Sequence, residues 1–118
     1  MLAELARQIE SLELPPDGAT LAEGFGLLDR LSAKLSDALG RFDGAQLWDL
    51  DAATSATAWL AEHGCMTRSA AASWCSRARR LRQCPHTAAA WATAVLNGGQ
   101  VSAICHDDSL RPILDLRS

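Results

Sequence analysis

The chain of 118 residues has few aromatic residues: four tryptophans, two phenylalanines and no tyrosine. β-Branched residues are also few, whereas alanine and leucine dominate, so helix propensity is high along the chain. With 48% apolar residues, a single domain of this size can form a hydrophobic core. We predict an all-α fold of five or six helices, with an N-terminal helical hairpin and one or two helix-turn-helix units. Residues 1–106 are expected to form this domain, and residues 107–118 a poorly ordered tail.

A signal peptide, a membrane span and common catalytic motifs are also lacking. The first ten residues, MLAELARQIE, carry acids where a signal peptide needs positive charge. Residues 83–106 lack Asp, Glu, Lys and Arg, but their proline and adjacent glycines do not fit a membrane span. The sequence contains neither a Gly-x-Ser-x-Gly motif nor a Gly-rich phosphate loop. We therefore predict a cytoplasmic, non-enzymatic protein with reduced cysteines, no cofactor and no small-molecule substrate.

Acidic residues are absent from residues 63–106, which hold five arginines. Residues 1–62 hold eleven acids and four bases. Such an asymmetry indicates either a polyanionic partner or mutual neutralisation of the two halves within the fold.

Two helices are predicted before residue 45. Leu2, Leu5, Ile9 and Leu12 share one helical face, and the segment 14–18, LPPDG, ends that helix. Thr20 is a candidate cap for a long second helix, with Glu23 as its capping-box partner. Its apolar residues follow a near-heptad pattern, called here the leucine stripe: Leu21, Phe25, Leu28, Leu31, Leu35, Leu39 and Phe42. This stripe requires a helical partner, either the first helix folded back or a second chain that forms a homodimer.

Residues 51–81 predict two more helices joined by a tight turn. We expect Gly64 to adopt a left-handed conformation at the end of the first helix, and Thr67 to cap the second. On a helical wheel, residues 68–82 place Ala71, Trp74, Cys75, Ala78 and Leu81 on one face. The opposite face holds Ser69, Ala72, Ser73, Ser76 and Arg80, with Arg77 and Arg79 on its flanks. Two helices with a short turn form the unit that many DNA-binding proteins share.

Serine hydroxyls on such a helix fit a major groove, and arginines bind backbone phosphates. The predicted ligand is therefore double-stranded DNA, and the predicted binding residues are Thr67, Arg68, Ser69, Ser73, Arg77, Arg79 and Arg80. The structural alternative is that the arginines complement the helix dipole and pair with acids such as Asp49 or Asp51.

The segment Cys84-Pro85-His86-Thr87 predicts a break and a new cap. A helix over residues 88–96 should bury Trp91 and Val95, Asn97-Gly98-Gly99 should end it, and a further helix is expected over residues 100–105. Two pairs, His63 with Cys65 and Cys84 with His86, bracket the basic helix and would make four ligands. Because their spacing is not that of known zinc sites, no metal is predicted.

Several short motifs resemble, in order, those of one family. They are Thr54–Ala61 (TSATAWLA), Met66–Ala71 (MTRSAA), Ala78–Leu81 (ARRL) and Cys84-Pro85. These motifs are similar to the helical domain of unknown function found upstream of HNH endonuclease domains in mycobacterial and other actinobacterial repeat-family proteins. The resemblance covers roughly residues 20–105 and implies an all-α module that contacts nucleic acid or is accessory to the nuclease.

Two departures from that family limit what the resemblance implies. Cys84 stands where the family prefers leucine, and the His/Asn/His metal site of the nuclease has no counterpart, so nuclease activity is not implied. The change to His106-Asp107-Asp108 suggests a truncated or frame-shifted member, although a cloning boundary would look the same. Three functions stay open: a nucleic-acid-contacting module, a protein-interaction module that dimerises without touching DNA, and a small helix-turn-helix regulator.

Overall fold

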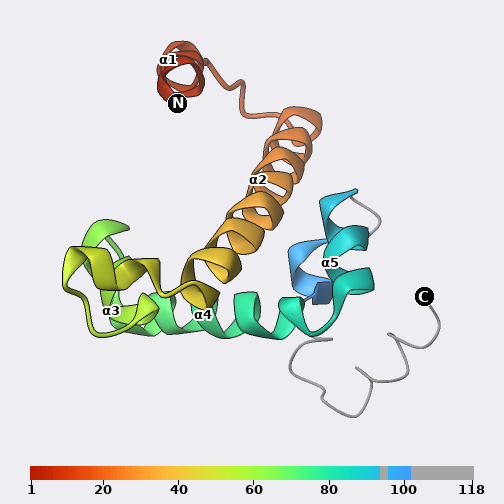
Figure 1. Ribbon diagram of the computed structural model, residues 1–118. Helices are drawn as coiled ribbons and strands as arrows, with labels where there is room; N and C mark the ends of the chain where they lie inside the picture. Colours follow the sequence, from red (N-terminus) through yellow and green to blue (C-terminus); the bar gives the residue numbers. More distant parts are fainter. Residues whose placement is uncertain (94–95, 102–118) are drawn as a thin grey trace.

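The computed structural model describes residues 1–93 and 96–101, and every regular element within them is a helix (Figure 1). The elements are α1 (Ala3–Ser11), α2 (Gly18–Gly44), the 3-10 helix η1 (Leu47–Asp51), α3 (Ala56–His63), α4 (Arg68–Arg82) and α5 (Pro85–Ala92). Residues 98–101 are also helical. The predicted all-α class with five to six helices is confirmed. The expectations for Val95, residues 102–105 and the tail lie outside the described residues.

The long helix α2 begins earlier than predicted, because Asp17 caps it instead of Thr20. Asp17 Oδ1 accepts a hydrogen bond from the Thr20 backbone N–H at 2.8 Å, and Asp17 Oδ2 accepts one from the Thr20 hydroxyl at 2.9 Å. These two bonds, the backbone one first, lower the pKa of Asp17 below its ordinary value. The first turn of α2 is thus fixed next to the proline turn.

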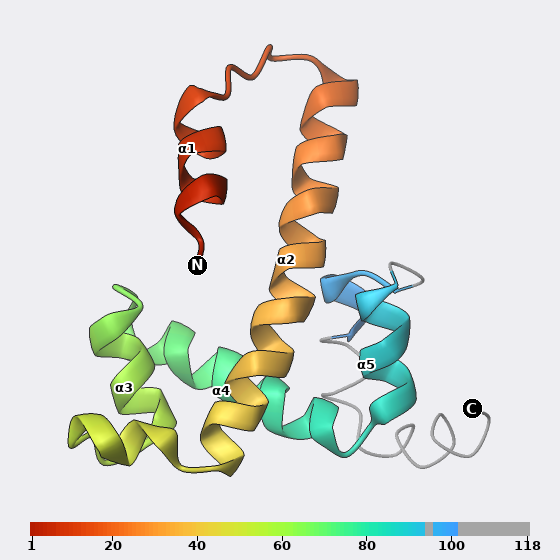
Figure 2. The same ribbon diagram turned by 45° about the horizontal axis from the view of Figure 1, so that its top comes forward.

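The connection between α1 and α2 turns at the predicted prolines, but the predicted packing of α1 across the leucine stripe is wrong. No residue of α1 is buried, and Leu5, Ile9 and Leu12 are exposed. The physical reason lies in the linker: Leu12 has extended backbone angles, and the prolines cannot continue a helix. In Figure 2, α1 turns back beside the N-terminal half of α2, but none of its residues is buried there.

The described core forms where α4 crosses the C-terminal half of α2 (Figures 1 and 2). The buried face of α2 holds only small residues, Ala33, Ser36 and Gly40. The buried face of α4 is the predicted one: Ala71, Cys75, Ala78 and Leu81. Burial raises the pKa of the Cys75 thiol, which therefore stays protonated and packs as a small apolar residue. Small side chains on both faces let the two backbones approach closely.

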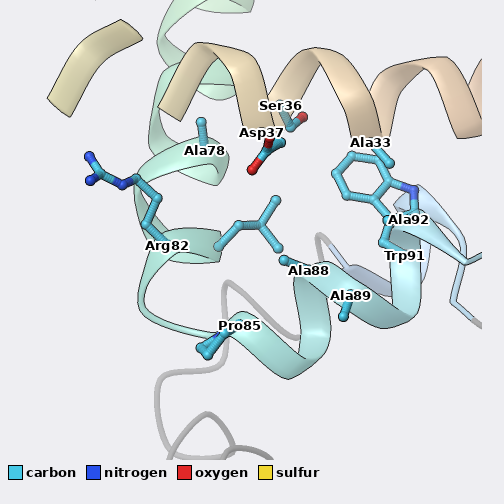
Figure 3. A pocket seen from close by; sticks show the side chains of 11 residues that line it. Ala33, Ser36, Asp37, Ala78, Arg82, Pro85, Ala88, Ala89, Trp91 and Ala92 are labelled. Atoms are coloured by element: carbon cyan, nitrogen blue, oxygen red, sulfur yellow. The ribbon is translucent and has the colours of Figure 1, made fainter. Parts of the chain in front are cut away.

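Helix α5 packs on the same part of α2. It begins at Pro85, three residues earlier than predicted, because proline fits the first helical position; Thr87, the expected cap, is buried instead. Trp91 is 1% exposed, and Figure 3 shows its indole ring beneath α2 beside Ala33.

One carboxylate on α2 holds this end of the fold together. Asp29 Oδ2 accepts a hydrogen bond from Trp91 Nε1 at 3.1 Å, and Asp29 Oδ1 accepts one from the Gly98 backbone N–H at 2.7 Å. Asn97 caps the helical residues 98–101, because its Oδ1 accepts from the Gln100 N–H at 2.9 Å. Helix α2 thereby fixes both α5 and the helical residues that follow it.

The turn between α3 and α4 differs from the prediction in one detail. Gly64 has φ −88°, whereas Cys65 adopts the left-handed conformation with φ 54°. Glycine still fits position 64 better than any other residue, because an added Cβ would lie 2.7 Å from the Leu60 carbonyl oxygen. Thr67 caps α4 as predicted, with its Oγ1 accepting from the Ala70 N–H at 3.1 Å.

The close approach of α2 and α4 yields a matched pair of variants. A Cβ on Gly40 would lie 3.1 Å from Arg82 Cδ and 3.3 Å from the Ala78 carbonyl oxygen, whereas nothing lies within 4 Å of one on Gly24. Gly40→Gln should therefore lower the free energy of unfolding by about 1–3 kcal/mol through overpacking. Gly24→Gln should raise it by about 0.5–1 kcal/mol through helix propensity. Urea unfolding followed by circular dichroism measures both; equal shifts of one sign would contradict the crossing.

Candidate interaction surfaces

The residues predicted to bind nucleic acid lie on α4 and at its cap. Among them, Thr67, Arg68, Ser69, Ser73 and Arg79 are exposed, whereas Arg77 and Arg80 are half-buried. Ala72 and Ser76 on the same face are exposed as well. In Figure 1, α2 crosses α4, and α3 and α5 lie toward the two ends of α4.

Arg79 forms an ion pair that joins α4 to α2. Its Nε donates to Asp43 Oδ2 at 2.6 Å, with the Arg79 side chain 57% and the Asp43 side chain 14% exposed. This hydrogen bond holds the pKa of Arg79 above its ordinary value. The partner of Arg79 is thus Asp43, whereas Asp49 or Asp51 was the expected acid. Asp51 accepts a hydrogen bond from Trp59 Nε1 at 2.8 Å.

Two more arginines of α4, Arg77 and Arg82, contact aromatic rings or a backbone carbonyl within the fold. The Arg77 guanidinium lies 4.6 Å from the Trp74 ring centroid and 5.0 Å from that of Trp91. Such cation–π contacts contribute about 0.5–2 kcal/mol. Arg82 Nη1 donates to the Gly40 carbonyl oxygen at 3.1 Å, in the last turns of α2, where the helix dipole favours a cation. Much of the positive charge of residues 63–101 therefore serves packing between helices.

The open face of α4 consists of Ser69, Ser73 and Ser76, with Arg68 at the helix start and Arg80 toward its end. The sequence between residues 63 and 101 contains no acid. Serine hydroxyls both donate and accept hydrogen bonds, and arginine binds phosphate oxygens. This face has the chemistry to contact a polyanion, with fewer available cations than the sequence predicts.

The four candidate metal ligands do not come together. His63 and Cys65 precede α4 and Cys84 and His86 follow it, and a helix of 15 residues spans about 22 Å. The His63 ring stacks on Trp59 at 4.6 Å, and Cys84 is buried. Within the part of the chain that the structure describes, no group of three or more His, Cys, Asp or Glu side chains is placed to hold a metal ion.

The leucine stripe lies beside the buried face of α2 instead of on it. Leu21, Phe25, Leu28 and Leu35 are exposed, and Phe25 is the most exposed of them at 68%. The exposed large apolar residues are Met1, Leu2, Leu5, Ile9, Leu12, Leu14, Leu21, Phe25, Leu27, Leu28, Leu35, Leu47 and Leu50. Most of them lie within residues 1–28, which comprise α1, the linker and the N-terminal half of α2, and these residues are called here the apolar surface.

An open pocket of about 370 Å³ continues this surface at the C-terminal end of α2. We call it the aromatic pocket; it is lined by Leu35, Ala38, Leu39, Phe42, Trp59, Leu60, Met66 and Trp74. The Phe42 and Trp59 rings pack with centroids 4.5 Å apart. The pocket is not predicted from the sequence, because its walls come from α2, α3, α4 and the turn before α4. The three aromatic residues on separate predicted helices are the feature that could have indicated it.

A second pocket of about 360 Å³ lies between α2, α4 and α5 (Figure 3). Its walls include Ala33, Ala78, Ala88 and Trp91, so it borders the core. The buried Ser36 hydroxyl lines it and has no hydrogen-bond partner among the described atoms.

Comparisons with known proteins add no relative: no protein-family model, curated protein or solved structure matches the chain. The resemblance to the HNH-associated helical domain therefore stays a prediction. Within the described residues, no helix combines the length and the apolar character that crossing a bilayer requires.

Proposed function

We propose that the chain is a non-catalytic helical protein-interaction module, which binds its partner through the leucine stripe and the aromatic pocket. The distribution of large apolar residues carries this proposal. The described core is built mainly from alanine and cysteine, with Leu81, Trp91 and Val101 as its large members. By contrast, Leu5 of α1 and four leucines of α2 are exposed, namely Leu21, Leu27, Leu28 and Leu35, whereas Leu31 and Leu39 are half-buried.

The size of this exposed surface separates it from ordinary surface leucines. Single exposed apolar residues are normal in folded proteins and need no explanation. Here Leu21, Phe25 and Leu28 recur on one face of α2 and lead to Leu35 at the rim of the aromatic pocket. Burying a leucine or phenylalanine side chain is worth about 1.5–3 kcal/mol, so covering this row provides ample binding free energy.

The predicted accessory role to an HNH endonuclease is compatible with this proposal. An interaction module can position a nuclease on another chain without contacting DNA itself. The exposed apolar residues belong mainly to α1, the linker and the N-terminal half of α2, whereas the open face belongs to α4, so binding at one does not exclude binding at the other.

Photo-crosslinking in cells tests the apolar surface directly. Phe25→p-benzoylphenylalanine should crosslink to protein, because this side chain is the most exposed of the stripe, whereas Ser73→p-benzoylphenylalanine on α4 should not. Adding Leu28→Gln should lower the amount of protein crosslinked through position 25 about tenfold, since the lost burial of the Leu28 side chain in the complex is worth about 1.5 kcal/mol. Equal products from both positions, or a Phe25 product that Leu28→Gln leaves unchanged, would contradict the proposal.

The open face of α4 favours nucleic-acid binding as a second candidate function. Its three serines are exposed beside Arg68 and Arg80, on a segment without acids. Binding of labelled duplex DNA should then weaken steeply with salt, with a slope of about −0.9 per phosphate contact.

The variant Arg68→Ala should reduce that slope by about one, because one phosphate contact of an exposed arginine is removed. Arg7→Ala serves as the control, because Arg7 is exposed on α1 and pairs with Glu4. Absent or salt-insensitive binding by the unaltered chain would remove this second candidate.

A further inference from the structure

We infer that the pocket between α2, α4 and α5, called here the core pocket, binds a small, uncharged, largely apolar molecule that carries one hydroxyl or carbonyl group. This inference goes beyond the proposed function, because the core pocket shares no lining residue with the apolar surface or with the aromatic pocket. The volume of the pocket, its alanine walls and the unpartnered hydroxyl of Ser36 together support it.

The core pocket is large for a space between packed helices. Its volume of about 360 Å³ lies in the range of small-molecule sites in proteins, about 300–1,000 Å³. Protein interiors are otherwise close-packed, with few voids larger than a water molecule. Small side chains leave the room, because the lining includes five alanines, Ala33, Ala78, Ala88, Ala89 and Ala92. An occupant whose atoms contact these walls would restore the dispersion contacts that the space lacks.

The larger apolar walls of the core pocket are held in place by the core. Trp91 is 1% exposed, and its Nε1 donates to Asp29 Oδ2 at 3.1 Å. Because the indole N–H already has this partner, the Trp91 ring offers an occupant apolar contact. Leu81 belongs to the same buried cluster, and both side chains line the pocket. The site is therefore largely formed before an occupant enters, which lowers the cost of binding.

The Ser36 hydroxyl is the polar group that an occupant would satisfy. Ser36 lines the pocket and is 1% exposed, and its Oγ has no hydrogen-bond partner among the described atoms. By comparison, the hydroxyl of Ser32, one turn earlier, donates to the Leu28 carbonyl oxygen at 2.9 Å. A buried polar group without a partner destabilises a fold, because it has lost its hydrogen bonds to water. Since a hydroxyl both donates and accepts, a ligand hydroxyl or carbonyl oxygen would complete the pair.

The two charged residues of the lining already have partners, which favours an uncharged ligand. Asp37 Oδ2 lies 2.9 Å from Arg41 Nη2, and Arg82 Nη1 donates to the Gly40 carbonyl oxygen at 3.1 Å. In Figure 3 the Arg82 guanidinium points away from the pocket. A charged ligand would lose its hydration at a site whose own charges are engaged elsewhere. Water fits poorly as well, because a buried water molecule needs about two to four polar partners, and Ser36 supplies one.

Titration of the purified full chain with two probes of equal shape tests the inference. The probes are 2-naphthol and 2-methylnaphthalene, which differ only by a hydroxyl in place of a methyl group. Both should shift the Trp91 side-chain N–H signal in ¹H–¹⁵N NMR spectra, and the shifts give two Kd values. Ser36→Ala should reduce the preference for 2-naphthol, measured as the ratio of these Kd values, about tenfold, because one buried hydrogen bond is lost. The same variant should keep its thermal midpoint, since it removes an unpartnered hydroxyl.

Matched alanine-to-leucine variants locate the bound probe. Ala88→Leu should weaken the binding of both probes at least about tenfold, because the leucine fills part of the core pocket and removes apolar contact area from the ligand. Ala89→Leu provides a second block at an exposed wall of the pocket, should Ala88→Leu change the helix content in circular dichroism. Ala38→Leu places the same side chain in the aromatic pocket instead, and it should leave both Kd values read at Trp91 unchanged.

Three results would overturn the inference. Absence of a shift at Trp91 shows that the core pocket takes no such molecule, whether it stays empty or residues 102–118 fill it. A shift that both Ala88→Leu and Ala89→Leu leave unchanged, or that Ala38→Leu abolishes, places the probe elsewhere. A ratio of Kd values that Ser36→Ala leaves unchanged excludes the hydrogen-bonding group from the ligand class. Each of these results leaves the proposed function standing, because the Phe25 crosslink tests a different surface.

Discussion

The close crossing of α2 and α4 is the constraint on which the rest of the structure depends. Gly40 and Ser36 of α2 meet Ala78 and its neighbours on α4, and a Cβ at Gly40 would lie only 3.1 Å from Arg82 Cδ and 3.3 Å from the Ala78 carbonyl oxygen. Because the crossing selects the small-residue face of α2 as its core face, four members of the leucine stripe stay exposed, namely Leu21, Phe25, Leu28 and Leu35. The exposed apolar surface is thus a consequence of how the core packs.

The same crossing decides how the arginines of α4 are used. Arg79 reaches Asp43 and Arg82 reaches the Gly40 carbonyl, because both side chains lie where α4 passes the end of α2. Arg77 lies over Trp74 and Trp91 and so links α4 to α5. A cluster that reads in sequence as a polyanion site is therefore largely a set of contacts between helices. Among residues 1–93 and 96–101, the serines of the open face make no such contacts, and they carry what remains of the nucleic-acid hypothesis.

The features predicted correctly from sequence are local ones. The buried face of α4 follows from the 3.6-residue period, and Thr67 caps α4 because its hydroxyl is next to the helix start. The core face of α2 was mispredicted, because hydrophobicity marks Leu28 and Leu35 while close packing depends on Gly40 and Ala33. The Arg79–Asp43 pair and the aromatic pocket join residues far apart in the chain, so no local pattern indicates them.

Solvent accessibility of the leucine stripe in solution tests this account most directly. Hydroxyl-radical footprinting of the purified chain at low concentration should label Leu21, Phe25 and Leu28 strongly and leave Trp91 protected. Protection of the stripe at the lowest concentration, together with labelling of Trp91, would contradict the packing of α2 and with it the proposed interaction surface.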